Sequence, residues 1–156
     1  MATPSIAMIP SGVKAGKVYS VLPTPVFGEE LVVNGGFNDG LNGWSAHSGS
    51  ILEIENGMAK VTTVSVQGFI KRADLIIETG KTYFCKAYIT NGLSPQWFIN
   101  GTNNSINLSL ISENTYGAYV TTTGNNSFFY IRGNNTTGEV SYIDNVSVKE
   151  VLTANA

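Results

Sequence analysis

Short runs of alternating hydrophobic and polar residues fill the chain from Leu31 onward, and turn-forming residues separate them. A period of two is typical of a β-strand with one buried face, and many short strands at regular spacing favour a β-sandwich. Hardly any segment shows the periodicity of a helix. We therefore predict strands over residues 50–55, 58–64, 67–74, 82–90, 96–100, 106–111, 118–122, 127–132 and 140–149.

The strand predicted over 82–90 has two faces of different character, because successive side chains point to opposite sides of a sheet. The face expected in the core holds Tyr83, Cys85, Ala87 and Ile89. The opposite face holds Phe84, Lys86, Tyr88 and Thr90. The second face is amphipathic, so we expect it to meet solvent or a partner.

Two local patterns bear on the register of neighbouring strands. Asn56 and Gly57 lie between the first two predicted strands and are a strong signal for a two-residue hairpin. In the last strand, one parity holds Tyr142, Asp144, Val146 and Val148. Ile143 then falls on the opposite face unless a bulge intervenes. On this parity Asp144 lies on the apolar face and needs a hydrogen-bond partner if it is buried.

The start of the chain differs from the rest. Residues 1–25 contain four of the five prolines, and residues 1–27 contain two lysines and no acid. The remainder has seven basic and eleven acidic residues, a net charge of −4. Proline fixes φ and removes a backbone donor, so this segment is expected to be extended. We divide the chain into an extended N-terminal arm, residues 1–28, and a globular domain, residues 29–156.

The arm is too apolar for a solvated linker. Its hydrophobic residues include Pro4, Ile6, Met8, Ile9, Val18, Tyr19, Val21 and Leu22. One interpretation is a disordered or self-packed terminus. The other, which we favour, is an anchoring arm that docks on another subunit by strand addition or by binding in a groove.

Composition narrows the choice of partners. Charged residues make up 13% of the chain, half the usual ~25%, and the net charge of −2 does not favour a nucleic-acid partner. A single cysteine, Cys85, excludes a disulfide framework, and with a single histidine, His47, a zinc cluster is nearly excluded. We interpret Cys85 as a small buried hydrophobic residue. No run reaches the ~18 apolar residues of a membrane span, and no secretion signal is expected.

The acidic residues do not predict catalysis. Glycoside hydrolysis needs two carboxylates that face each other across a cleft. Glu53 and Glu55 lie two apart on one strand face, which is typical of solvated surface, and Glu29 and Glu30 lie at the domain boundary. His47 has no serine or cysteine in a nucleophile motif. We therefore predict that the protein is not an enzyme.

Three blocks resemble one family. LVVNGGF at 31–37 and GLNGW at 40–44, then ETGKTY at 78–83 and YIDNVSV at 142–148, resemble carbohydrate-binding modules of the family 4/9 type. The resemblance spans about residues 31–150. It implies an all-β jelly-roll β-sandwich of two antiparallel sheets, with Phe37 and Trp44 closing one end of the core. This fold is reused widely, so the resemblance does not by itself imply sugar binding.

The resemblance also bears on cofactors. In similar modules a carboxylate in the region of Asp144 can help to hold a structural calcium ion. The alternative, which we favour, is that Asp144 accepts hydrogen bonds from loop amides. We expect no other cofactor.

The arm has a resemblance of its own. TPSIAMIPSG at 3–12 and KVYSVLP at 17–23 resemble a leader found on structural proteins of tailed bacteriophages, where it precedes differing C-terminal domains. This implies a docking peptide. Our first hypothesis is a virion accessory protein: a capsid decoration, head-fibre or tail-fibre subunit. It would assemble in the host cytoplasm, contact other virion proteins through its arm, and form a homo-oligomer such as a trimer.

The alternative hypothesis is a module that binds glycans directly, because sugar rings stack on exposed aromatic side chains. The candidate residues are Trp97, Tyr88, Tyr130 and Phe84, with Lys86 and Arg132 as hydrogen-bond donors. If Lys86 and Arg132 mark the solvent-facing parity, Tyr88 and Tyr130 share one sheet surface. The same residue types are also enriched at oligomer interfaces, so composition leaves both interpretations open.

Overall fold

A computed structural model describes residues 13–14, 17–18, 24–47, 49–65, 69–72, 74–92, 95–99, 105–123 and 129–152. Throughout these ranges all regular structure is β and the sheets are antiparallel, which confirms the predicted fold class. Within the same ranges there is no helix long and apolar enough to cross a membrane. Residues 27–152 form one compact unit, and residues 1–26 with 153–156 form another.

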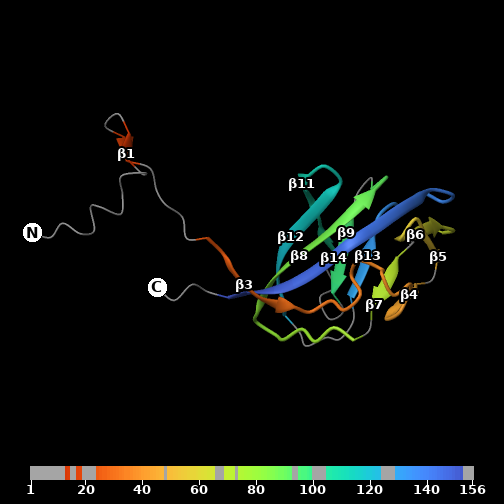
Figure 1. Ribbon diagram of the computed structural model, residues 1–156, viewed down its shortest axis with the longest axis horizontal. Helices are drawn as coiled ribbons and strands as arrows, with labels where there is room; N and C mark the ends of the chain where they lie inside the picture. Colours follow the sequence, from red (N-terminus) through yellow and green to blue (C-terminus); the bar gives the residue numbers. More distant parts are fainter. Residues whose placement is uncertain are drawn as a thin grey trace, which may run out of the picture. The chain divides into compact units, whose positions relative to one another are not determined.

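The larger sheet has seven strands. They are β3 (Val26–Glu30), β5 (Ser50–Glu55), β6 (Met58–Thr63), β8 (Thr82–Thr90), β11 (Ser109–Ser112), β12 (Thr115–Thr121) and β14 (Val140–Leu152). Their order is β11-β12-β8-β14-β6-β5, and β3 also pairs with β14 (Figure 1). The long strand β14 therefore organises this sheet, because β8, β6 and β3 all pair with it.

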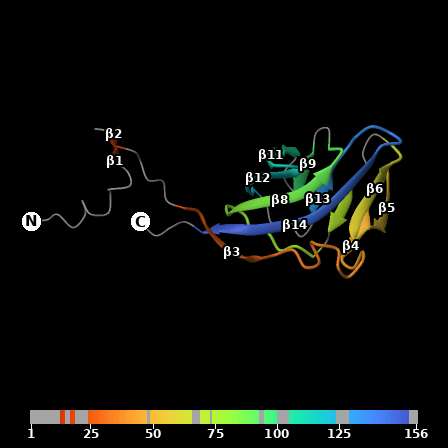
Figure 2. The same cartoon turned by 45° about the horizontal axis from the view of Figure 1, so that its top comes forward.

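The smaller sheet has five strands. They are β4 (Trp44–Ala46), β7 (Ile70–Arg72), β9 (Gln96–Ile99), β10 (Ser105–Asn107) and β13 (Phe129–Arg132). Their order is β10-β9-β13-β7-β4. The two sheets form the two layers of the sandwich, with β8 and β14 in one layer and β4 and β13 in the other (Figure 2).

The core lies between these layers. The predicted inner face of β8 is confirmed, since Cys85, Ala87 and Ile89 are fully buried and Tyr83 nearly so. Ile131 faces them from β13 and is also fully buried. Burial of each large apolar side chain stabilises the fold by about 1.5–3 kcal/mol. Burial also raises the pKa of the Cys85 thiol far above its usual range, so this thiol is inert.

The block at 31–44 closes one end of the core, as predicted. Phe37 and Trp44 are buried, and their ring centroids lie 5.1 Å apart. Asn34, with φ of +58°, donates from Nδ2 to the carbonyl oxygens of Gly40 and Asn42, each at 3.0 Å. The indole nitrogen of Trp44 donates to the Asn34 carbonyl oxygen at 2.9 Å. The asparagine thus ties the loop to the buried indole.

A guanidinium group supports the same end of the core. The Arg72 side chain is 3% exposed and forms a bidentate ion pair with Asp74, at 2.6 and 2.8 Å. It lies 5.3 Å from the centroid of the Trp44 ring. A Cβ at Gly43 would lie 2.7 Å from this guanidinium, and the φ of Gly43 is +82°. Only glycine therefore fits at position 43 without a shift of its neighbours.

The bulge that the sequence left open in β14 is present, so the expected parity holds for Val146 and Val148 but not for Tyr142 and Asp144, which are only half-buried. Ile143 is fully buried, and Val146 and Val148 are buried too. The pairing with β8 shifts register between Asp144 and Ser147, and Asn145 has a φ of +49°. The bulge places one extra residue of β14 opposite β8. Ile143 before the bulge and Val146 and Val148 after it can therefore all face the core. Asp144 lies on the outer side, half-buried, and accepts a hydrogen bond from the Asn145 amide at 2.8 Å.

Among the other predicted elements, one turn is confirmed, one strand is divided into two, and two strands were missed. The Asn56 and Gly57 hairpin is confirmed, with φ of +55° and +77° and direct pairing of β5 with β6. The strand expected over 106–111 is in fact two strands, β10 and β11, which belong to different sheets. Strands β3 and β4 were not predicted, because each is short and adjoins a turn or a proline.

The unit that contains the arm is described only in part. Two short strands, β1 (Val13–Lys14) and β2 (Lys17–Val18), pair with each other. The predicted anchoring residues Pro4, Ile6, Met8, Ile9, Tyr19, Val21 and Leu22, and the side chain of Val18, lie outside the described residues. Docking of the arm therefore stays a prediction.

Candidate functional site

The predicted glycan-binding residues fall on two different sheets. Phe84, Lys86 and Tyr88 lie on β8 in the seven-stranded sheet. Trp97 lies on β9, and Tyr130 and Arg132 lie on β13, in the five-stranded sheet. The expectation that Tyr88 and Tyr130 share one sheet surface is therefore wrong, because β8 and β13 belong to opposite layers. The molecule offers two outer faces, and each is a separate candidate.

The first candidate is the outer face of the five-stranded sheet. Ile131 and Ile70 are register partners and point into the core, so Tyr130 and Arg132 point outward. The His47 ring centroid lies 4.8 Å from that of Tyr130 and 5.9 Å from that of Phe69. The Phe69 and Tyr130 centroids are 6.3 Å apart. Three rings from β13 and from the ends of β4 and β7 thus form one cluster.

A row of polar groups continues from this cluster along the same face. The Arg132 guanidinium lies 5.6 Å from the centroid of the Phe69 ring and donates to Oε1 of Gln96. Nε2 of Gln96 donates to Oδ1 of Asn107 at 2.7 Å. Partial burial lowers the pKa of Arg132, which still leaves the group charged at neutral pH. We call His47, Phe69, Tyr130, Arg132, Gln96 and Asn107 the aromatic face.

Two members of the aromatic face were missed in the sequence. His47 was considered only for zinc binding and for catalysis, and Phe69 was not singled out at all. A usable signal was present for Phe69, because it shares parity with Lys71 in a predicted strand. The backbone of Trp97 pairs with Ile131 and Ile106, while its side chain lies outside the described residues. The proposed stacking role of Trp97 therefore stays a prediction.

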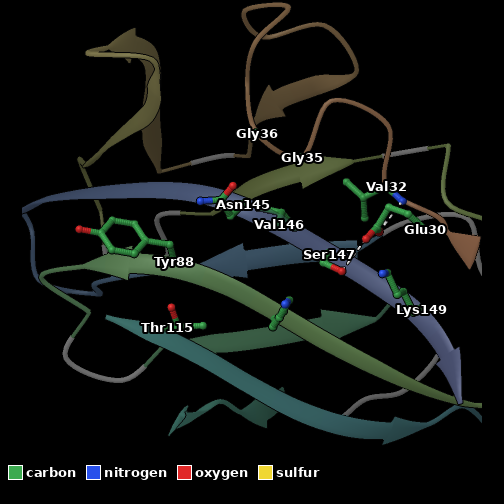
Figure 3. A pocket seen from close by; sticks show the side chains of 11 residues that line it. Glu30, Val32, Gly35, Gly36, Tyr88, Thr115, Asn145, Val146, Ser147 and Lys149 are labelled. Carbon is green, nitrogen blue, oxygen red and sulfur yellow. Dashed lines mark hydrogen bonds between the residues drawn. The ribbon is translucent and has the colours of Figure 1, made fainter. Parts of the chain in front are cut away.

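The second candidate is a pocket on the outer face of the seven-stranded sheet, with a volume of about 550 Å³. We call it the sheet pocket. Its polar lining comes from β3, β8, β12 and β14: Glu30, Lys86, Tyr88, Thr115, Asn145, Ser147 and Lys149. Figure 3 shows Tyr88 and Thr115 at one end of the pocket and Glu30 and Lys149 at the other. Two of the predicted glycan residues, Tyr88 and Lys86, thus line a real cavity.

Glu30 is held in place by the strand it faces. Its Oε1 accepts from the backbone amides of Val148 at 2.8 Å and Val32 at 3.1 Å. Its Oε2 accepts from Oγ of Ser147 at 2.5 Å, as drawn in Figure 3. These bonds fix the strand β3 beside β14. The carboxylate is therefore structural and forms one wall of the pocket.

Phe84, the remaining predicted glycan residue, lies beside the pocket in an aromatic row. Its ring centroid is 5.6 Å from that of Phe27 on β3 and 4.8 Å from that of Tyr119 on β12. Phe84 itself is half-buried, whereas Tyr119 is 55% exposed. Phe84 thus packs between its neighbours and has less free ring surface to offer a ligand than Tyr119.

The carboxylates expected at the surface lie there. Glu53 is exposed and is the register partner of Lys60. Glu55 accepts from Nζ of Lys60 at 2.9 Å and from the Tyr142 hydroxyl. These hydrogen bonds, the one from Tyr142 foremost, lower the pKa of Glu55.

Among the described residues, no group of three or more His, Cys, Asp or Glu side chains is arranged to hold a metal. A calcium ion near Asp144 therefore stays a prediction.

Comparison with known proteins bears on the fold. No protein-family model and no curated protein sequence matches the chain. Its structure is similar to the CBM22-1 xylan-binding domain of Paenibacillus barcinonensis Xyn10C, with a TM-score of 0.60 and 11% identity over 81% of this chain and 97% of that one. It is also similar to a point mutant of the family 29 carbohydrate-binding module CBM29-2, with a TM-score of 0.54 and 14% identity over 82% and 87%.

A third similar structure is the CBM22-1–GH10 part of Clostridium thermocellum xylanase 10B in complex with xylohexaose. Its TM-score is 0.54, with 14% identity over 77% of this chain and 28% of that one. These likenesses establish the jelly-roll fold of carbohydrate-binding modules. The family 4/9 assignment stays a resemblance of sequence motifs. The fold of this chain is that of a carbohydrate-binding module.

Proposed function

We propose that the protein is a non-catalytic glycan-binding module and that the aromatic face is its binding surface. The observation that carries the proposal is the cluster of His47, Phe69 and Tyr130 beside the row of Arg132, Gln96 and Asn107 on one sheet face. The similar structures include a xylan-binding domain and a complex with xylohexaose, which supports a neutral polysaccharide as the ligand class.

The chemistry of the face suits a sugar chain. A pyranose ring has an apolar face that packs on aromatic rings, while its hydroxyl groups need donors and acceptors at the edge. Tyr130 offers the half-exposed ring, and the linked side chains of Arg132 and Gln96 offer polar atoms in a fixed arrangement. Because these polar groups already hold one another, little side-chain freedom is lost when a ligand binds.

The test is binding to a panel of neutral polysaccharides, with xylan, mannan and cellulose included, followed by titration of soluble oligosaccharides. Tyr130→Ala should weaken binding about tenfold, the expected effect of losing one stacked ring. Tyr119→Ala is the matched control, since it removes an exposed ring from the opposite sheet. Failure of the unaltered protein to bind any member of the panel, or equal binding by Tyr130→Ala, would reject the proposal.

A second function rests on the resemblance of residues 3–12 and 17–23 to a bacteriophage leader. It is a virion accessory protein that is anchored to other virion proteins by its arm and displays the jelly roll as a homo-oligomer, such as a trimer. The two functions are compatible, because the arm and the aromatic face are separate parts of the chain. Deletion of residues 1–25 should abolish incorporation into particles, and unchanged incorporation would reject the anchor.

A further inference from the structure

The sheet pocket carries a net positive charge, in contrast to the negative charge of the chain as a whole. The chain has a net charge of −2, yet Lys86 and Lys149 both line this cavity, and Glu30 is the one acidic side chain among its described lining residues. We propose that the sheet pocket is a second binding site, specific for an acidic sugar that presents a carboxylate to Lys86 and Lys149. It lies in the opposite layer from the aromatic face and does not depend on the function proposed there.

The two pocket lysines differ from other lysines of this fold. Lys60 pairs with Glu55 at 2.9 Å, and Lys81 pairs with Glu78 at 3.0 Å and with Glu150 at 3.1 Å. Within the described part of the chain, neither Lys86 nor Lys149 forms an ion pair. Two ammonium groups in one cavity repel each other, so an anionic ligand that contacts both relieves that repulsion.

Glu30 does not neutralise the lysines by direct contact. Its two oxygens are occupied by the amides of Val32 and Val148 and by the hydroxyl of Ser147. The carboxylate is thus directed at the β14 backbone, and its hydrogen bonds fix it there. Its negative charge weakens the field of the pocket but leaves both ammonium groups available to a ligand.

The rest of the lining suits the ring and hydroxyl groups of a sugar. Tyr88 and Thr115 are register partners on β8 and β12, so an aromatic ring and a hydroxyl lie side by side. Asn145 is exposed at the bulge of β14 and adds an amide (Figure 3). Gly35 and Gly36 form part of the wall without side chains. The volume of about 550 Å³ lies within the range of small-molecule sites, about 300–1,000 Å³.

The experiment compares two ligands that differ at one carbon. Methyl β-glucuronide carries a carboxylate where methyl β-glucoside carries a hydroxymethyl group. Titration of the full chain, followed by amide chemical shifts in NMR spectra, should show the glucuronide binding at least about tenfold more tightly, as expected for charge-assisted hydrogen bonds. The shifted amides should belong to β8, β12 and β14. Equal affinity for the two ligands would overturn the proposal.

Variants locate the site. Lys86→Gln and Lys149→Gln should each weaken glucuronide binding severalfold, and Tyr88→Ala should weaken it as well. Lys60→Gln is the matched control, because it removes the same charge from a paired lysine elsewhere in the same sheet. Tyr130→Ala should leave glucuronide binding unchanged, which separates this site from the aromatic face. Unchanged binding in both pocket lysine variants would overturn the proposal, as would acetate that competes as well as the glucuronide.

Discussion

The two outer faces of the sandwich use their polar groups in opposite ways. On the five-stranded sheet, the guanidinium of Arg132 is bonded to Gln96, and Gln96 is bonded to Asn107. On the seven-stranded sheet, the ammonium groups of Lys86 and Lys149 form no ion pair within the described residues. The first face is a preformed polar and aromatic surface, whereas the second has charge that a ligand can neutralise. The two faces therefore differ in the kind of ligand that each would suit.

Ile143→Ala should have the largest effect, because it removes a fully buried side chain of β14, the strand that lies between β8 and β6 in the sheet of the second face. The lost contacts and the cavity should lower the free energy of unfolding by about 2–5 kcal/mol. That is a large part of the stability of a typical domain, about 5–15 kcal/mol. Chemical denaturation measures the loss. Ile76→Ala, at a side chain that is 76% exposed, is the matched control and should cost far less, and an equal loss in both variants would contradict the assigned core.

Salt concentration should have the next largest effect, and its influence on ligand binding should differ between the two faces. Raising ionic strength from about 20 to about 300 mM shortens the screening length severalfold, so glucuronide binding at the sheet pocket should weaken about fivefold. Neutral oligosaccharide binding at the aromatic face should change less than about twofold. Isothermal titration at both salt concentrations measures each. A neutral ligand with the steeper salt dependence would contradict this assignment of the faces.

Glu30→Gln should move stability and affinity in opposite directions. Glutamine retains one acceptor oxygen and cannot replace all three hydrogen bonds, so the free energy of unfolding should fall by about 1 kcal/mol. Removal of a negative charge from the pocket should strengthen glucuronide binding about twofold. Glu29→Gln, the neighbouring residue on the same strand, is the control for both measurements. Weaker glucuronide binding by a folded Glu30→Gln variant would argue against the pocket's charge model.

The smallest effect concerns pH. The Tyr142 hydroxyl and Lys60 hold the pKa of Glu55 below its ordinary value of 4.5, so their contribution is present above that pH and is lost as pH falls through the folded-state pKa. Tyr142→Phe should therefore lower the melting temperature slightly at neutral pH and not at about pH 3. Neither Tyr142 nor Glu55 lines the sheet pocket or belongs to the aromatic face, so ligand affinity should not change. A difference that persists in acid would exclude this hydrogen bond as its cause.

Local patterns in the sequence were sufficient for some elements. The bounds of β5 and β8 match the prediction, because alternation is regular there and Asn56 with Gly57 fixes one turn. The burial of Phe37 and Trp44, in the block at 31–44, was also predicted correctly. In each case the physical cause lies within a few residues of its effect.

Other features depend on residues far apart in the chain. Alternation tells which side chains of β8 and β13 share a face of their own strand, but not which sheet each strand joins. Tyr88 and Tyr130 were therefore placed together when they lie in opposite layers. The sequence left the bulge at Asn145 open. The left-handed conformation of Asn145 accompanies the pairing of β14 with β8, and alternation within β14 alone does not reveal that pairing. His47 follows β4 and Phe69 precedes β7, so the contact between their rings depends on the pairing of these two strands.

The placement of the two faces in opposite layers has a mechanical consequence. Packed sheets lie about 10 Å apart, so ligands on the two outer faces are held a short, fixed distance from each other by a rigid core. A single polymer strand would have to wrap around an edge of the sandwich to occupy both. A monomer with both faces filled would instead fasten two different strands together, one neutral and one acidic. Mixed gels of such polymers would stiffen at low protein concentration, without any need for oligomers.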